Sequence, residues 1–409
     1  MKNQNQSKVK KVVLAFSGGL DTSFCVVYLK EKFNCEVVTV TVDTGGFDKK
    51  EIEEIAKKSK ELGAAKHYFL DGKKEVFNSV QYIIKGNILR GGNYPMSAGL
   101  ERLAIAKLVS QVAKKEKADA VAHGSTSVGN DQIRFDLAFQ SLLPGVKILV
   151  PFRDLNMKRM DEEKFLKNHG FKVSAKTAKY SVNKGFWGNT VSGGEIHNSW
   201  QEIPVTAFPH GFDVGKSPNK PGYVAIGFKK GIPVSVNDKK FNPLEIITTL
   251  NKIGYKHGVG KETVLTTLAL GLKARIGVEA PAALILIKAH QHLEGLTLTW
   301  EQILIKDLIS QFYREYIHKG LSFDPVVKDI EALIDNSQKF VTGQVKIKLF
   351  KGHISAVACQ SPYSLMLKDF GVYTEKASWS GEEARGFVKL SGLQGTIANI
   401  VHNKLTKKN

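Results

Sequence analysis

The chain has 409 residues, which is long enough for two or three domains with large hydrophobic cores. Apolar residues make up 42% of it and charged residues 24%, and its apolar runs are far too short to span a bilayer, so we expect a globular protein without a membrane-spanning segment. The net charge is +20, but the lysines are scattered along the chain, which favours a solvated basic surface over a nucleic-acid partner.

The first 170 residues alternate short apolar segments with amphipathic ones. Strand-like segments occupy residues 12–16, 36–42, 67–70, 118–123 and 148–152. Residues 48–62 predict a helix, because Asp48 and Glu51 have the spacing of a capping box and Gly63 follows the last turn. Residues 97–117 repeat the helical period. This alternation predicts an α/β fold with a parallel sheet covered by helices, in which ligands bind at the carboxyl ends of the strands.

The pattern changes after residue 171, where strands and helices no longer alternate. Strand-like segments are expected at residues 224–228, 233–236, 343–350 and 353–359, the last two as a hairpin, and helices at residues 243–253, 261–271 and 299–316. We therefore predict three parts: a nucleotide-binding domain over residues 1–171, an α+β domain over residues 172–365, and a C-terminal extension over residues 366–409.

The segment AFSGGLDTS, residues 15–23, lies where the first predicted strand meets a helix. Two adjacent glycines let the backbone approach a ligand, and the helix start offers free N–H groups and a partial positive charge. With three hydroxyl residues this makes a cradle for phosphate, although a plain strand–turn–helix with a capping Ser is the alternative. Asp21 would repel phosphate unless a metal bridges the two, so it predicts bound Mg²⁺.

A second polar cluster, AHGSTSVGNDQIRFD, covers residues 122–136 after the fourth predicted strand. Turn chemistry explains an Asn-Asp pair, but it explains neither Gly124 nor Arg134. The guanidinium of Arg134 can bind a carboxylate with two parallel hydrogen bonds. His123 is interpreted as a structural residue at a strand end. The two clusters are expected at the same edge of the sheet.

These segments resemble those of a known family. The first resembles the S-G-G-x-D-[ST]-S signature of the pyrophosphate-binding ATPases, and it matches the A-[YF]-S-G-G-L-D-T-S of argininosuccinate synthases in full. The second resembles their segment H-G-x-T-x-x-G-N-D-Q-x-R-F, and KHGVG and KAH, residues 256–260 and 288–290, fall where the family has similar motifs. The resemblance covers about residues 11–360 and implies an ATP pyrophosphatase-type domain, a synthetase and oligomerisation domain, and a homotetramer.

The resemblance also implies a reaction, in which ATP drives the ligation of citrulline and aspartate to argininosuccinate in arginine biosynthesis. The ureido oxygen of citrulline would attack the α-phosphate, releasing pyrophosphate and leaving citrullyl-AMP. The aspartate amine would then displace AMP. Both steps need positioning and charge neutralisation more than a protein nucleophile, which suits hydroxyls, one Arg and Mg²⁺.

Site residues follow from the resemblance position by position. Expected ATP contacts are Ala15, Phe16, Ser17, Gly18, Gly19, Leu20, Asp21, Thr22, Ser23, Val42 and Gly124. Expected aspartate contacts are Thr126, Asn130 and Asp131, and expected citrulline contacts are Tyr94, Ser97, Asn130, Arg134, Ser181 and Thr190. Asp21, Asp131 and Arg134 are the expected catalytic residues, with Asp21 as the Mg²⁺ ligand. A packing role alone is the alternative for Tyr94.

Departures from the family pattern lie at the citrulline end. The family's citrulline-binding Glu falls on Thr266 and its Tyr on Val278, and one hydroxyl is lost, for which Ser97 is the expected substitute. An α-ammonium would lack its carboxylate partner there. The same chemistry on an Nα-acylated citrulline therefore stays open as an alternative.

Two rival classes remain. A tRNA-modifying adenylating enzyme of the same superfamily would need a catalytic Cys, but none of Cys25, Cys35 and Cys359 is expected in a loop facing Asp21. A binding protein without turnover would not need the intact first motif. The few cysteines and the absence of an export signal at the basic N-terminus lead us to expect a cytoplasmic protein.

Overall fold

The computed structural model describes residues 9–157, 159–171 and 179–406. The chain divides into two compact units, Met1–Tyr363 and Ser364–Asn409. The predicted boundary after residue 171 adjoins residues 172–178, which lie outside the described residues, and it stays a prediction. Across the described ranges, no helix has the length and apolar character needed to cross a membrane.

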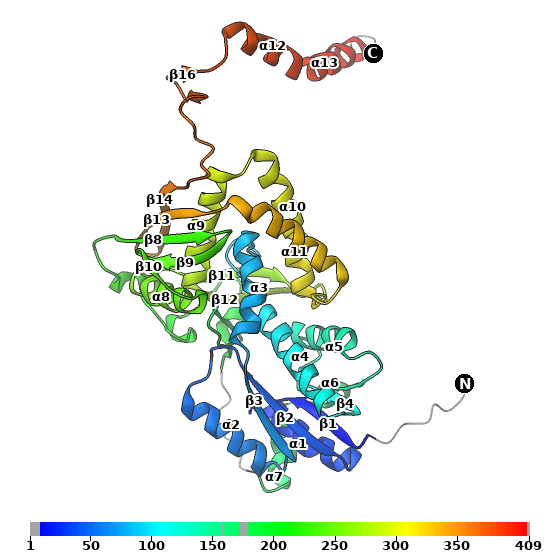
Figure 1. Cartoon of the computed structure of the whole chain (residues 1–409). Helices are drawn as coiled ribbons and strands as arrows, with labels where there is room; N and C mark the ends of the chain where they lie inside the picture. The colour runs from blue at the N-terminus through cyan, green and yellow to red at the C-terminus, as the bar shows by residue number, and fades with distance from the viewer. Residues whose placement is uncertain (1–8, 158, 172–178, 407–409) are drawn as a thin grey trace. The chain divides into compact units, whose positions relative to one another are not determined.

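Five parallel strands form the first sheet, in the order β3-β2-β1-β4-β5 (Figure 1). They are β1 Lys11–Ala15, β2 Glu36–Asp43, β3 Lys66–Asp71, β4 Ala120–Ala122 and β5 Lys147–Leu149. The predicted α/β fold is confirmed. The expectation that the fifth strand reaches residue 152 is wrong, because Pro151 starts a short helix, where its fixed φ and missing N–H cost nothing.

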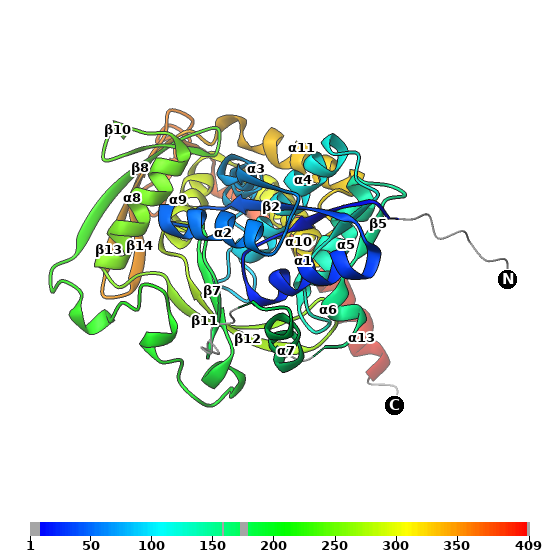
Figure 2. The ribbon, with the colours of Figure 1, turned by 90° about the horizontal axis from the view of Figure 1, so that it is seen from below.

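Helices cover both faces of this sheet. They are α1 Leu20–Phe33, α2 Lys49–Glu61, α3 Lys73–Lys85, α4 Ser97–Lys115, α5 Asn130–Leu142, α6 Pro151–Asp154 and α7 Arg159–Asn168. Side chains alternate along β1, so Val12 packs with α1 and α7 while Val13 packs with α3 and α4. α1 has α6 and α7 as neighbours on the first of these faces (Figure 2). The predicted capping box of Asp48 and Glu51 starts α2.

The second half of the larger unit holds two more sheets, in the orders β10-β9-β8-β13-β14 and β11-β12-β7-β6. Their strands are β6 Ser181–Asn183, β7 Asn189–Ser192, β8 Gly222–Lys229, β9 Ile232–Val236, β10 Lys239–Lys240, β11 Lys261–Thr267, β12 Lys273–Glu279, β13 Gly343–Phe350 and β14 His353–Gln360. The helices are η1 Gly194–His197, η2 Val205–Ala207, η3 Val214–Lys216, α8 Pro243–Lys256, α9 Pro281–Thr297, α10 Trp300–Lys319, α11 Pro325–Ser337 and η4 Gln338–Phe340. The predicted hairpin of residues 343–359 is confirmed.

The helix predicted over residues 261–271 is wrong. This segment forms strand β11, which pairs antiparallel with β12 along its whole length. Thr263, Val264, Thr266 and Thr267 are β-branched, and such residues favour strands because their stiff side chains pack well on a pleated surface. Pairing with β12 therefore outweighs the helical spacing of the apolar residues.

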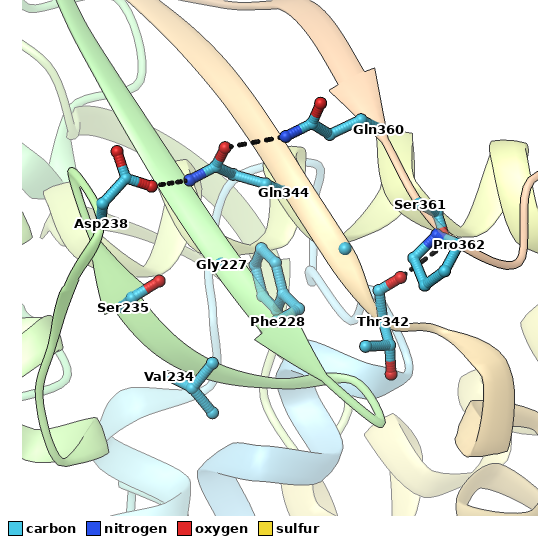
Figure 3. Close-up of a pocket in the computed structure, with 11 residues that line it drawn as sticks. Gly227, Phe228, Val234, Ser235, Asp238, Thr342, Gln344, Gln360, Ser361 and Pro362 are labelled. Carbon is cyan, nitrogen blue, oxygen red and sulfur yellow. Dashed lines mark hydrogen bonds between the residues drawn. The ribbon is translucent and has the colours of Figure 1, made fainter.

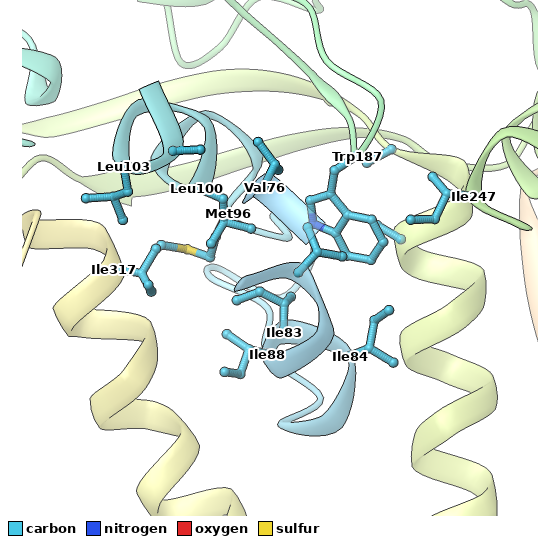
Figure 4. Packing of buried hydrophobic residues seen from close by; sticks show 14 of the residues in the cluster. Val76, Ile83, Ile84, Ile88, Met96, Leu100, Leu103, Trp187, Ile247 and Ile317 are labelled. Atoms are coloured by element: carbon cyan, nitrogen blue, oxygen red, sulfur yellow. The ribbon is translucent and has the colours of Figure 1, made fainter. Parts of the chain in front are cut away.

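One buried cluster joins the two halves of the larger unit (Figure 4). Trp187, from the turn between β6 and β7, is fully buried beside Ile84 of α3 and Ile247 of α8. Its ring N–H donates to the Pro95 carbonyl at 2.8 Å, just before α4. This packing holds the start of α4, with the predicted citrulline contacts Tyr94 and Ser97, against the second half of the unit.

The smaller unit is described by itself. It contains β15 Gly371–Val372, β16 Lys376–Ala377, α12 Gly381–Ser391 and α13 Leu393–Thr406. α12 begins with a capping box of Ser380 and Glu383. None of the residues of α12 is buried.

Candidate active site

The loop after β1 has the geometry of an anion cradle. Gly18 adopts a left-handed φ of +74°, which favours glycine. Gly19 is the N-cap of α1, and no side chain caps that helix, so its first N–H groups point to the loop without a side-chain partner. Lys58 of α2 donates to the Gly18 carbonyl at 2.7 Å and adds a positive charge that the sequence pattern did not predict.

The three hydroxyls of this loop have different environments. The Ser23 hydroxyl is buried and donates to the Gly19 carbonyl at 2.6 Å, so it serves the helix backbone. Ser17 is exposed, and its Oγ lies 3.3 Å from Thr22 Oγ1. Ser17 and Thr22 are therefore the hydroxyls placed to meet a ligand, while Ala15, Phe16 and Val42 are buried.

Gly124 brings the second cluster to the first. A Cβ atom built on Gly124 would lie 3.1 Å from Thr22 Cγ2 and 3.2 Å from Thr22 N, closer than nearly all real contacts. The loop after β4 therefore packs directly on the start of α1, and only glycine fits there without a shift. The two clusters share one edge of the parallel sheet.

Asp21 faces a second acid, Glu162 of α7. Burial raises the pKa of Asp21, and burial together with the Asp21 charge raises the pKa of Glu162 to about 8. Glu162 is 0% exposed, and neither of its oxygens has a hydrogen-bond donor. Nothing in the spacing of residues 159–168 links Glu162 to the first cluster, so the sequence analysis missed it.

Asp131 lies between two guanidinium groups. Arg102 Nε is 2.9 Å from its Oδ2, and Arg134 Nη1 is 3.1 Å from its Oδ1. Burial alone would raise the pKa of Asp131, but the two positive charges outweigh burial and hold this pKa below its usual value. Asp131 is therefore a carboxylate at neutral pH. Arg102 was not predicted, although its place on α4 puts it between Asp131 and β6.

Arg102 and Arg134 connect Asp131 to the second half of the unit. Arg102 Nη2 donates to Asn183 Oδ1, and the Asn183 amide donates to Thr190 Oγ1 at 3.3 Å. Arg134 Nε donates to the His318 carbonyl at 3.2 Å. The predicted residues Asp131, Arg134 and Thr190 thus belong to one chain of polar contacts.

The remaining predicted site residues differ in burial and in hydrogen bonding. Tyr94 is buried in the main core and its hydroxyl accepts the Ala98 N–H at 3.1 Å. Ser97 is fully buried and its hydroxyl has no hydrogen-bond partner. Asn130 accepts the Ala269 N–H at 2.8 Å, and Ser181 is exposed on β6. Thr126 lies in the loop before α5, with its Oγ1 3.7 Å from a Cβ built on Gly129.

The two departures from the family pattern lie on neighbouring strands. Val278 of β12 is fully buried and pairs in register with Thr190 of β7. Thr266 of β11 accepts a hydrogen bond from Arg90 Nε at 2.9 Å, and Arg90 Nη1 is 2.6 Å from Glu315 of α10. An arginine and its carboxylate partner therefore stand beside Thr266, and neither was predicted.

Two other features lie outside this site. A pocket over one end of β8, β9, β13 and β14 is lined by Phe228, Ser235 and Pro362, and there Gln344 donates to Asp238 at 2.6 Å (Figure 3). It contains none of the predicted site residues. Within the described part of the chain, no group of three or more His, Cys, Asp and Glu side chains is placed to hold a metal ion.

Comparison with known proteins gives matches over nearly the whole chain. The family model described as the arginosuccinate synthase N-terminal HUP domain matches residues 11–172, and the one described as the C-terminal domain matches residues 180–398. A curated argininosuccinate synthase of Endomicrobium trichonymphae is 40% identical over 388 residues, 94% of each chain. Those of Pyrococcus furiosus and Archaeoglobus fulgidus are 40% and 42% identical over 394 residues, covering 96% and 95% of this chain and 95% and 98% of theirs. The chain belongs to the argininosuccinate synthase family.

Proposed function

We propose that the protein is a carbon–nitrogen ligase that joins citrulline to aspartate, consuming ATP and releasing AMP, pyrophosphate and argininosuccinate in arginine biosynthesis. One observation carries the proposal: Gly124 packs directly on the start of α1. This contact brings the phosphate cradle and the Asp131–Arg134 cluster to the same edge of the parallel sheet. The relatives named above carry the name of this activity.

The comparisons favour neither alternative. The relatives named above are argininosuccinate synthases, not tRNA-modifying enzymes, and nothing in their names indicates an acylated substrate. A thiolating enzyme needs a reactive thiolate, but Cys25 is fully buried, and burial raises the pKa of its thiol. Plain citrulline is therefore the proposed substrate.

In the first step the chain's own residues position ATP. The free N–H groups at the start of α1 and the hydroxyls of Ser17 and Thr22 would hold phosphate oxygens, and the glycines let them approach. Asp21, with the donor-free carboxyl of Glu162 facing it, fits Mg²⁺, which prefers carboxylate and phosphate oxygens. When bound, Mg²⁺ would supply charge neutralisation for the leaving pyrophosphate.

In the second step the Asp131 cluster would position the amino acids. Asp131 is ionised and offers its charge to the aspartate ammonium, with Thr126 and Asn130 nearby in the same loop and helix start. Arg134 would orient citrulline in both steps. In the first step the ureido oxygen would attack the α-phosphorus, and in the second the aspartate amine would displace AMP. Holding the reactants in this geometry would supply a large part of the rate gain, beside electrostatic stabilisation of the developing charge.

The test is an assay of pyrophosphate release by the purified chain with ATP, citrulline and aspartate, with and without tRNA. We expect isotope exchange between pyrophosphate and ATP to require citrulline but not aspartate, and tRNA to have no effect. An aspartate requirement for exchange would contradict the two-step order. A kcat/KM higher for Nα-acetylcitrulline or Nα-succinylcitrulline than for citrulline would contradict the proposed substrate.

We further propose a cytoplasmic homotetramer. The three cysteines are free, which is typical of a reducing compartment. The exposed apolar side chains of the C-terminal unit support an assembly in which they are buried.

A further inference from the structure

Helices α1 and α7 run parallel, so that the first turn of one contacts the first turn of the other and their last turns also lie together. Phe24 and Phe165 pack edge to face at the middle, with ring centroids 5.0 Å apart. Glu31, near the end of α1, lies 3.2 Å from His169, just after α7. Asp21 and Glu162 face each other at the other end, in the first turns of both helices. The two helix starts therefore converge beside the phosphate cradle.

Glu162 is an acidic residue on the face of α7 that otherwise packs apolar side chains against α1. It lies three and four residues before Phe165 and Leu166, so it shares the helix face that packs on α1. It is 0% exposed, no N–H group among the described residues bonds its oxygens, and the group that faces it is the carboxyl of Asp21. Burying two carboxyls against each other without a cation is costly, so a stable chain needs a reason to place Glu162 there.

We propose that Glu162 is a second carboxylate ligand, with Asp21, of the divalent cation that accompanies ATP; this inference rests on the proposed function. Protein-bound Mg²⁺ commonly takes one or two carboxylates and completes its octahedron with substrate phosphates and water. Two acids beside a phosphate cradle match that set. No third acidic, His or Cys ligand is available among the residues whose structure is described, so phosphate and water complete the coordination.

The charges around the pair favour a cation. Arg159, in the first turn of α7, also faces both carboxyls and lowers the pKa of each. When a cation displaces the proton that burial keeps on the pair, the two carboxylates carry one more negative charge than Arg159 offsets. A divalent ion would compensate that charge, and the Arg159 side chain would still be free to meet a phosphate oxygen.

The experiment measures Mn²⁺ binding to the full-length protein by electron paramagnetic resonance, with the non-cleavable analogue α,β-methylene-ATP and without amino-acid substrates. We expect Glu162→Gln and Glu162→Leu to weaken Mn²⁺ binding by about tenfold or more, as loss of a carboxylate near a metal does. Asp21→Asn should weaken it similarly. Glu31→Gln is the matched control, because Glu31 lies between the same two helices at their exposed ends, and it should bind Mn²⁺ like the unchanged protein.

Wild-type Mn²⁺ affinity in Glu162→Gln would overturn the inference and would leave the pair as two carboxyls sharing a proton. Thermal unfolding of each variant checks the fold, and Glu162→Leu keeps the test valid if the amide is not tolerated, because Leu suits the apolar surroundings. The proposed function fails separately: loss of Mn²⁺ binding in the variants, with no citrulline-dependent pyrophosphate release by the unchanged protein, would refute the ligase activity and leave the metal site standing.

Discussion

Arg134 links the two halves of the candidate active site through one planar side chain. Its Nη1 contacts Asp131 at 3.1 Å and its Nε donates to the His318 carbonyl at 3.2 Å. A lysine would keep the charge but could not make both contacts with this geometry. The role of Arg134 therefore depends on shape as much as on charge.

We predict that Arg134→Lys lowers kcat/KM for citrulline and aspartate far more than it weakens ATP binding. Loss of one charge-assisted hydrogen bond costs about 1.5–3 kcal/mol, or roughly 10- to 150-fold. Steady-state kinetics with each substrate varied in turn measures this, with Arg385→Lys on the exposed surface of α12 as the control. Unchanged Michaelis constants for both amino acids would show that Arg134 only supports the fold.

His318 gives the stability of the protein a specific pH dependence. Burial and the charges of Arg90 and Arg134 lower its pKa to about 4. In the unfolded chain the ring takes up a proton near pH 6.5. Between these values the unfolded state binds more protons, so this contribution to stability is complete above about pH 6.5 and is lost as the pH falls towards 4.

We expect the free energy of unfolding to fall less between pH 7.5 and pH 4.5 in His318→Gln than in the unchanged protein. Urea unfolding at several pH values measures the difference, and His353→Gln at an exposed position of β14 is the control. Equal pH dependence in His318→Gln and the unchanged protein would mean that the ring is not kept neutral by its surroundings.

At the scale of the elements, a buried ion pair joins α9 to α10. Lys306 is 0% exposed and Glu294 1% exposed, and Lys306 Nζ lies 2.7 Å from Glu294 Oε2. Gln338 donates to the other Glu294 oxygen at 2.7 Å. Lys306 and Gln338 are both buried, and Asn87, which donates to Oε2 as well, is partly buried, so the carboxylate is held almost entirely by protein groups.

We predict that Lys306→Met destabilises the protein by about 3–5 kcal/mol, because it leaves the Glu294 charge buried without its cation. Adding Glu294→Gln should restore part of that loss. Denaturant unfolding measures both, and Lys328→Met, which breaks an ion pair of an exposed lysine with Glu331, should cost less than about 1 kcal/mol. A loss of that small size for Lys306→Met would show that water reaches the pair.

At the scale of the whole molecule, the C-terminal unit exposes an apolar surface. Phe387, Val388 and Leu390 of α12 and Leu393 and Ile397 of α13 are all roughly half exposed or more. Apolar patches of this kind on soluble proteins mark interfaces. We propose that copies of this chain cover the patch.

A chain ending at residue 363 should accordingly form a smaller assembly than the full chain, which we expect to be a tetramer. Light scattering coupled to gel filtration measures both masses, and circular dichroism checks that residues 1–363, one compact unit, remain folded. Equal subunit numbers in the two chains would contradict a role of the C-terminal unit in assembly.

The parallel sheet could be read from the sequence because its signals are local. Short buried runs rich in valine define β1 and β2, a capping box of two residues three positions apart starts α2, and glycine follows its end. The rule that the carboxyl ends of parallel strands share an edge then predicts that Ser17 and Gly124 lie near each other. Their proposed roles in binding remain predictions.

The rest depended on which surfaces meet in three dimensions. β11 became a strand because β12 offered it a pairing edge, and its apolar spacing alone did not reveal that. Glu162, Arg102 and Glu315 reach the site from three helices far apart in the chain, and Arg90 from a loop, in sequence contexts no different from a solvated surface. A periodic pattern reports whether a side chain is buried, but only the packing of whole elements determines which charge it is buried against.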